Sequence, residues 1–207
     1  FGNLMAKESK EFYLTVNYGS SAIKEADWKA TISDINYKGK INFKEGSGWE
    51  TGLGYDFGKI RTELTFSEFN NEITATNAQL NEGINKGLEV VSSATGDFKF
   101  NNLFINNYLE LPIGKKKKFI PYIGGGIGAS ILKIENIIVA GEKLDSVNTW
   151  LFGYSWKFGL NYFISQNLGI FGEGNSTGFN DFGIAGKKNG LDINSEIGYR
   201  GGFLIYF

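Results

Sequence analysis

The charged side chains of this sequence that could do chemistry recur at alternate positions of extended segments. Glu50, Lys157 and Arg200 each follow an aromatic residue, and the residues after them are Thr51, Phe158 and Gly201. The full set with this pattern is Glu50, Asp56, Arg61, Glu63, Glu110, Lys157, Glu173, Glu196 and Arg200. Because side chains two residues apart point to the same face of a strand, these acids and bases are expected to share one face.

Histidine and cysteine are both absent from the 207 residues. Their absence excludes Ser-His-Asp and Cys-His nucleophiles, histidine or thiolate zinc sites and disulfides. Paired carboxylates of the glycosidase type remain, but a narrow interior leaves no room for a sugar substrate. We therefore predict no catalytic residue and no metal site.

Two further ligand classes are also disfavoured. Gly124, Gly126 and Ala129 match a dinucleotide fingerprint only as a string, because no helical segment follows them, so no cofactor is expected. The net charge of −1 and the pI near 5.7 do not suit a nucleic-acid partner, which favours a basic surface.

The elements that must position these side chains are strands with one apolar and one polar face. The clearest is residues 191–207, where Ile197, Tyr199 and Phe203 alternate with Glu196 and Arg200. Eight such segments are predicted, at residues 12–20, 47–57, 60–70, 98–111, 119–134, 148–164, 168–175 and 191–207. Several exceed the five or six residues usual in soluble proteins and reach the length, about 9 to 11, that crosses a bilayer.

Gly58 and Lys59 separate two of these segments and predict a tight hairpin of type II′. Pairing Phe57 with Ile60 places residues 55 and 62, then 53 and 64, opposite each other. It also sets Asp56 opposite Arg61, so that an acid meets a base.

The connections alternate between long and short, which is typical of outer-membrane barrels. The long ones are residues 21–46, 71–97, 135–147 and 176–190, interpreted as exposed loops, with a short helix possible within 71–97. The predicted fold is all-β: an eight-stranded antiparallel up-and-down transmembrane β-barrel with four long outer loops and three short periplasmic turns, forming one domain over residues 1–207. No apolar run suits a transmembrane helix. The first residues lack a signal peptide, so the numbering of an exported chain is expected to begin after cleavage.

The polar face is rich in glycine, which suits a narrow eight-stranded lumen rather than a solvated surface. The large rings are therefore expected to face lipid. The aromatic residues predicted at the two membrane interfaces are Trp49, Phe57, Trp150, Tyr162, Tyr199 and Phe207.

Because side chains fill an eight-stranded lumen, the nine charged residues are expected to form a packed polar plug. The alternative is that they line a small conductive path. An unpaired buried charge is costly, so ion pairs are expected. We predict Asp56 with Arg61 and Lys157 with Glu173.

The glycine-rich stretch of residues 121–128, preceded by Asn-Asn-Tyr-Leu-Glu-Leu at 106–111, resembles a hairpin of small outer-membrane barrels of the opacity-protein type, an OmpA-like porin or surface-antigen family. The terminal Phe207 resembles the barrel-insertion signal of such proteins. The resemblance implies a protein of the bacterial outer membrane that is not an enzyme. Its implied partners are phospholipid, lipopolysaccharide and the barrel-insertion machinery.

The function expected from this class is a surface-exposed structural or interaction role in envelope integrity, adhesion or antigenicity, exerted through the outer loops. Two alternatives stay open. One is a small porin-like channel for solutes or ions. The other is a soluble lipocalin-like barrel, in which the rows of rings would line a ligand cavity.

Overall fold

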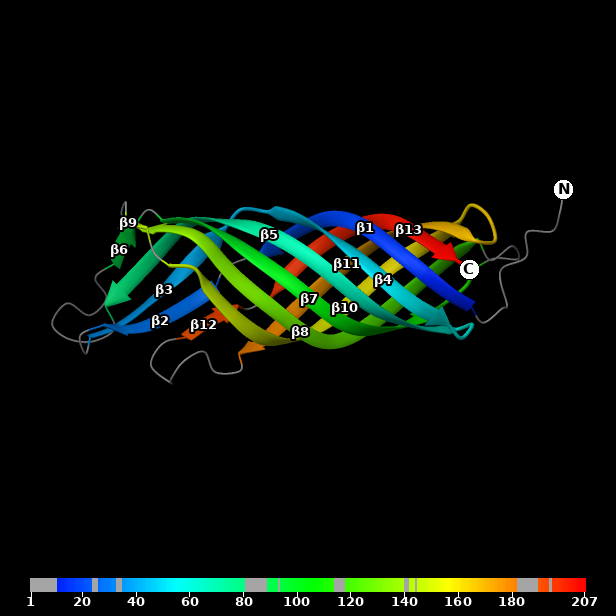
Figure 1. The fold of residues 1–207 in the computed structure, drawn as a ribbon, viewed down its shortest axis with the longest axis horizontal. Helices are drawn as coiled ribbons and strands as arrows, with labels where there is room; N and C mark the ends of the chain where they lie inside the picture. Colours follow the sequence, from blue (N-terminus) through cyan, green and yellow to red (C-terminus); the bar gives the residue numbers. More distant parts are fainter. Residues whose placement is uncertain are drawn as a thin grey trace.

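Eight long strands lie side by side and close into a barrel (Figure 1). Their bounds are β1 Glu11–Ile23, β4 Gly46–Asp56, β5 Ile60–Leu80, β7 Ala94–Glu110, β8 Phe119–Val139, β10 Val147–Phe163, β11 Leu168–Asp181 and β13 Glu196–Tyr206. The structure, a computed structural model, describes residues 11–23, 26–32, 35–80, 89–92, 94–113, 118–139, 142–143, 145–181, 190–193 and 195–207.

Every pairing in the barrel is antiparallel, and β1 closes it by pairing with both β4 and β13. The remaining neighbours follow in the order β4, β5, β7, β8, β10, β11 and β13. The predicted eight-stranded antiparallel barrel is therefore confirmed. No helix in the described part of the chain is long and apolar enough to cross a membrane.

The hairpin between β4 and β5 has the predicted register, with Leu53 opposite Leu64 and Asp56 opposite Arg61. The amide of Phe57 donates to the carbonyl of Ile60 over 2.8 Å, which closes the two-residue turn. Gly58 has a φ of 107°, a conformation that residues with a Cβ rarely adopt. The glycine at this position is what permits so tight a turn.

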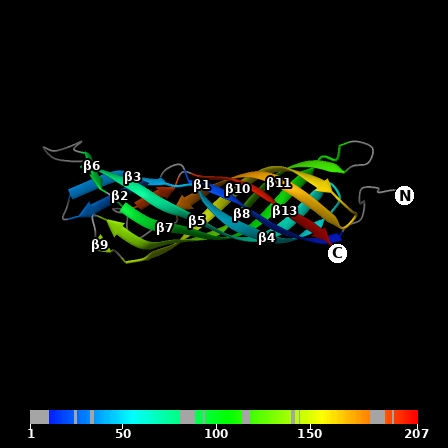
Figure 2. The ribbon, with the colours of Figure 1, turned by 90° about the horizontal axis from the view of Figure 1, so that it is seen from above.

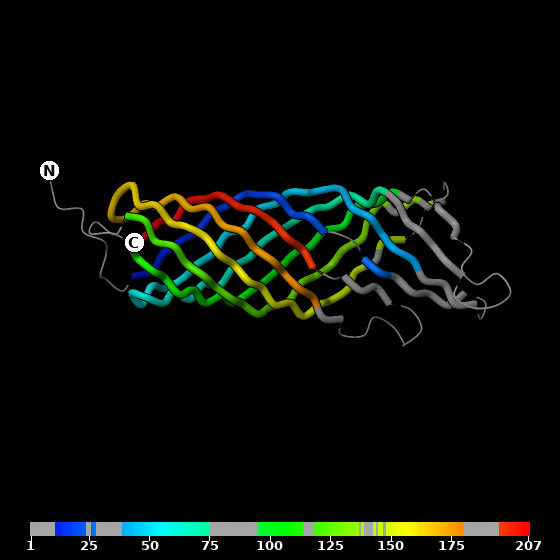
Figure 3. The backbone as a smooth tube through the Cα atoms, turned by 180° about the vertical axis from the view of Figure 1, so that it is seen from behind, coloured from blue at the N-terminus to red at the C-terminus, as the bar shows by residue number. Residues whose placement is uncertain are grey.

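Five shorter strands extend the barrel at the end away from the tight turns (Figures 1 and 2). They are β2 Ala26–Ile32, β3 Ile35–Phe43, β6 Glu89–Ser92, β9 Glu142–Lys143 and β12 Gly190–Ile193. The interpretation of residues 21–46, 71–97, 135–147 and 176–190 as loops is wrong for most of their described residues, which lie in strands. Seen from behind, the long strands of the barrel run obliquely to its length (Figure 3). Of the helix suggested within 71–97, residues 81–88 and 93 lie outside the described residues, and the rest is mostly strand.

The last predicted strand is also divided in two. β12 pairs with β2 in the extension, whereas β13 pairs with β1 and β11 in the barrel wall. The alternation of residues 191–207 continues across this division, so the sequence pattern does not reveal it.

The two faces of a strand exchange their character along its length, and β5 shows this most clearly. Near the tight turn, Leu64 and Phe66 point outward while Glu63 is buried inside. Further along, Phe69 and Ile73 are buried inside while the outward residues are polar. From the tight turn toward the extension, β5 thus changes from the pattern of a membrane barrel to the pattern of a water-soluble barrel.

The inverted part of the barrel contains an apolar core in place of charged groups. Phe100 stacks on Phe179 with ring centroids 4.9 Å apart, and Phe98 lies beside Phe100 at 5.9 Å. The buried members of this cluster, called the outer plug below, are Ile23, Ala26, Ile73, Phe98, Phe100, Leu132, Leu151 and Phe179. All but one of these residues lie on the long strands; Ala26 is on β2, and Ile41 and Phe43 of β3 pack against the cluster, so hydrophobic burial joins the long strands to part of the extension.

Candidate functional site

All nine charged residues singled out in the sequence are buried inside the barrel, with at most 7% of each residue exposed. They come from β4, β5, β7, β10, β11 and β13. Each stands at an inward position because strand alternation gives it the same parity as the buried glycines and asparagines beside it. The alternation of inward and outward positions along each strand was therefore enough to predict which charged residues form this interior cluster.

The charged cluster has an upper half, nearer the extension, and a lower half, nearer the tight turns. Glu50 is the centre of the upper half. Its two carboxylate oxygens accept hydrogen bonds from Lys157 Nζ at 2.7 Å and from Arg200 at 2.6 Å. Asn17 adds a third donor at 3.2 Å. One carboxylate thus bridges two buried cations that come from strands on either side of β11.

Both cations have a second, longer contact with an acid. Lys157 Nζ lies 3.4 Å from Glu173, so the ion pair predicted between these residues is present. Arg200 lies 3.8 Å from Glu196, and its guanidinium stands over the Phe69 ring at 4.3 Å. The charged layer therefore ends against aromatic carbon, which separates it from the outer plug.

Arg61 organises the lower half, close to the tight turns. Its Nε lies 2.5 Å from a carboxylate oxygen of Glu110. The guanidinium carbon also stands over the rings of Tyr13, Tyr108 and Tyr122, at 5.0, 4.8 and 5.3 Å from their centroids. Such cation–π contacts stabilise a cation that has lost its water.

The predicted pairing of Asp56 with Arg61 is wrong, although the two residues are opposite in the register. Asp56 instead accepts a hydrogen bond from the Tyr206 hydroxyl at 2.8 Å and from the amide of Gly58 at 2.6 Å. The turn amide holds the Asp56 carboxylate at the rim, whereas Arg61 extends into the barrel toward β7. A cross-strand register fixes backbones but not the direction in which long side chains reach.

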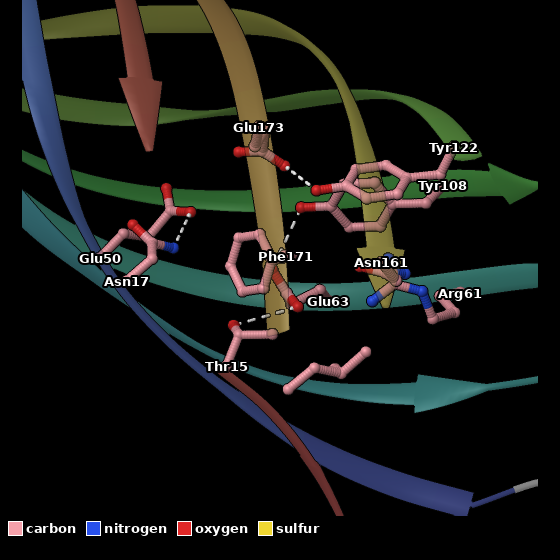
Figure 4. A pocket seen from close by; sticks show the side chains of 11 residues that line it. Thr15, Asn17, Glu50, Arg61, Glu63, Tyr108, Tyr122, Asn161, Phe171 and Glu173 are labelled. Atoms are coloured by element: carbon pink, nitrogen blue, oxygen red, sulfur yellow. Dashed lines mark hydrogen bonds between the residues drawn. The ribbon is translucent and has the colours of Figure 1, made fainter. Parts of the chain in front are cut away.

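Glu63 lies between the two halves and is bound by neutral donors (Figure 4). The hydroxyls of Tyr108 and Thr15 donate to its two oxygens at 3.1 and 3.2 Å. The Tyr122 hydroxyl donates to Glu173 at 3.0 Å in the same region. The buried tyrosines thus belong to the cluster, and their inward parity is the signal that could have assigned Tyr13, Tyr122 and Tyr206 to it.

Neutral side chains fill the space between the charged layer and the outer plug. Asn102 donates to Ser67 at 3.0 Å and accepts from Ser130 at 2.5 Å. Asn106 donates to Thr65 at 3.0 Å and accepts from Ser155 at 2.9 Å. These bonds connect β5, β7, β8 and β10 across the interior.

Little free volume remains within the charged layer. Two of its cavities measure about 10 Å³ each, one beside Glu63 and one beside Arg200. A volume of this size holds about one water molecule. Within the described residues no group of three or more histidine, cysteine, aspartate or glutamate side chains is placed to hold a metal ion.

The outward face of the barrel carries the large apolar side chains. Trp150, Tyr199 and Phe207 are each more than 60% exposed, and Trp49 and Phe57 are exposed as well. Tyr162 is partly covered by Phe119, whose ring centroid is 4.9 Å away. The rings therefore do not line an internal cavity, which contradicts the alternative of a soluble lipocalin-like barrel.

Comparison with known proteins supports this architecture at the level of the fold. No family model matches the sequence, and no curated protein matches it closely. Among solved structures, the outer membrane protein OprG from Pseudomonas aeruginosa is similar, with a TM-score of 0.59, 14% identity and 98% of both chains covered. Neisserial surface protein A matches with a TM-score of 0.56 and 13% identity over 95% of this chain and 97% of its own. The outer membrane protease OmpT from Escherichia coli matches at 0.54 and 9%, covering 97% and 99%.

The fold and the outward apolar belt together define the class of protein: an eight-stranded outer-membrane β-barrel. Its resemblance to small OmpA-like and opacity-type barrels extends over nearly the whole chain. The expected location in the bacterial outer membrane agrees with the fold and with the similarity to these solved structures.

Proposed function

We propose that this protein is an integral outer-membrane barrel with a plugged interior, and that it acts as a surface-exposed structural or interaction protein. Adhesion, envelope integrity and surface antigenicity are the roles that suit it. The strand extension beyond the lipid-facing belt is the part that meets the exterior, in place of the exposed loops expected from the sequence. No catalytic step is proposed for the interior.

The observation that supports the plug is the pair of buried ion pairs that Glu50 forms with Lys157 and Arg200 across the interior. In the described part of the interior, ion pairs, tyrosine rings and two water-sized cavities support the proposal that no solute passes. The outer plug then blocks the same interior a second time with packed phenylalanines.

Orientation can be tested with single cysteines, because the natural sequence has none. Lys143 is exposed in β9, and Lys59 is exposed in the turn between β4 and β5. A membrane-impermeant maleimide should label Lys143→Cys in intact cells and Lys59→Cys only after the outer membrane is permeabilised. Labelling of Lys59→Cys alone in intact cells would refute an extension that faces outward.

The plug can be tested by conductance in planar bilayers. The wild-type barrel should show no conductance above that of the lipid. The variant Tyr108→Ala/Tyr122→Ala removes two inward rings but leaves the outer plug in place, so it should stay closed. Adding Phe98→Ala and Phe100→Ala, which open the outer plug, should allow conductance, whereas Tyr154→Ala removes an outward ring and should not. Steady conductance by the wild type would instead favour the small porin-like channel.

The terminal strand is proposed to carry the signal for barrel insertion. The Phe207 side chain is 67% exposed, and its amide donates to the carbonyl of Phe12 at 3.1 Å, where the barrel closes. Phe207→Ala should reduce the amount of heat-modifiable barrel in cells while leaving refolding of the purified protein in detergent unchanged. Equal loss in both settings would indicate a purely structural role.

A further inference from the structure

The outward apolar belt does not reach the same height on every strand. On β5 it extends from Ile60 to Phe66 and is followed by the exposed Glu68. On β10 it extends from Tyr162 to Trp150, with only aromatic and apolar side chains on the outward positions between them. The belt therefore reaches further toward the extension on the side formed by β8 and β10.

A pair of lysines stands directly above this taller flank. Lys99 on β7 and Lys133 on β8 are opposite each other in the register, one step beyond Ile131 and Trp150. Both point outward, because Phe98, Phe100 and Leu132 beside them are buried inside. Like charges placed directly opposite destabilise a sheet, so an arrangement of this kind calls for a compensating anion.

Among the residues that the structure describes, Lys99 has such an anion and Lys133 does not. Lys99 Nζ lies 2.7 Å from Glu135, and both side chains are only about one-third exposed. The nearby Asp97 is engaged with the amide of Asn136 at 2.7 Å. Lys133 forms no ion pair within the described residues. An unpaired cation therefore lies where lipid-facing carbon gives way to polar surface.

We propose that this flank is a binding site for lipopolysaccharide, with a lipid A phosphate at Lys133 and Lys99 and acyl chains along Ile131, Trp150 and Phe152. A ligand bound here must have an apolar part and an anionic part, since the apolar flank and the cation lie one register step apart. The site faces the outer leaflet only if the extension lies outside the cell, so this inference rests on the proposed orientation. Membrane-proximal lysines attract anionic lipid headgroups, each by roughly fivefold in affinity.

Native mass spectrometry of the purified barrel with lipid A, in detergent, tests the site. The wild type should retain lipid A, and Lys133→Gln should weaken retention about fivefold. Glu135→Gln should strengthen it, because it releases Lys99 from its internal partner. Lys59→Gln makes the same charge change in the turn at the other end and should bind like the wild type.

Three results would overturn the proposal: unchanged retention in Lys133→Gln, equal retention of lipid A that lacks its phosphates, or equal retention of phosphatidylglycerol. The opposite signs expected for Lys133→Gln and Glu135→Gln separate a binding site from a general loss of folding. Heat-modifiable gel mobility is measured on every sample. A wild type without that shift would contradict the barrel itself, whereas a shifted barrel without lipid A selectivity would contradict only this site.

Discussion

Replacing Glu50 by glutamine should destabilise the barrel more than any other charge-removing change of equal size. The substitution keeps the shape of the side chain but removes the carboxylate that accepts from Lys157 at 2.7 Å and Arg200 at 2.6 Å. The two cations would then depend on Glu173 at 3.4 Å and Glu196 at 3.8 Å. Removing one member of a buried ion pair costs about 3 to 5 kcal/mol, because the remaining charge is left uncompensated.

The assay is urea unfolding of the barrel in lipid vesicles, followed by tryptophan fluorescence. Glu72→Gln is the matched control, since its ion pair with Lys44 at 3.0 Å is exposed and should contribute about 0 to 1 kcal/mol. Lys157→Met in the Glu50→Gln background should recover part of the loss by removing one orphaned cation. The reasoning fails if Glu50→Gln and Glu72→Gln lower the free energy of unfolding by the same amount.

Three further predictions use the same unfolding assay. Gly58→Ala should lose about 1 to 2 kcal/mol because of its positive φ, whereas Gly172→Ala, whose Cβ would meet open space, should be nearly neutral; equal effects would contradict a strained turn. Ile105→Arg should cost about 2 to 4 kcal/mol in vesicles because it faces the middle of the lipid, and a harmless substitution there would place the belt outside the membrane. Phe100→Ala should cost about 3 to 5 kcal/mol by opening a cavity in the outer plug, and should make the extension more sensitive to protease; unchanged stability would mean that this core is not closely packed.

The barrel and the composition of its interior could be predicted because lipid imposes one rule on every strand. Outward positions must be apolar, so the charged residues that share the other parity have to face inward. The register of β4 and β5 followed from a two-residue turn that offers few alternatives, and Leu53 stands opposite Leu64 as expected. These inferences depended only on parity and turn length.

The extension could not be predicted by the same rule. Beyond the membrane the outward face meets water, so the polar and apolar positions exchange places, as Phe69 and Ile73 show on β5. The sequence prediction required apolar residues on the outward face of each strand. Beyond the exchange that face is polar, so residues 71–97 did not fit the pattern and were interpreted as a loop. The Lys157–Glu173 pair was predicted, but the partner of Arg61 was not. Arg61 pairs with Glu110 because of the direction in which its long side chain extends, which backbone register does not determine.

The apolar packing of Phe98, Phe100 and Phe179 ties the described residues at the extension end to one another. An antibody or a receptor that meets this end encounters residues from several distant parts of the chain held in one arrangement. Recognition there would depend on the folded state, and short peptides cut from β3 or β5 would be poor mimics of it.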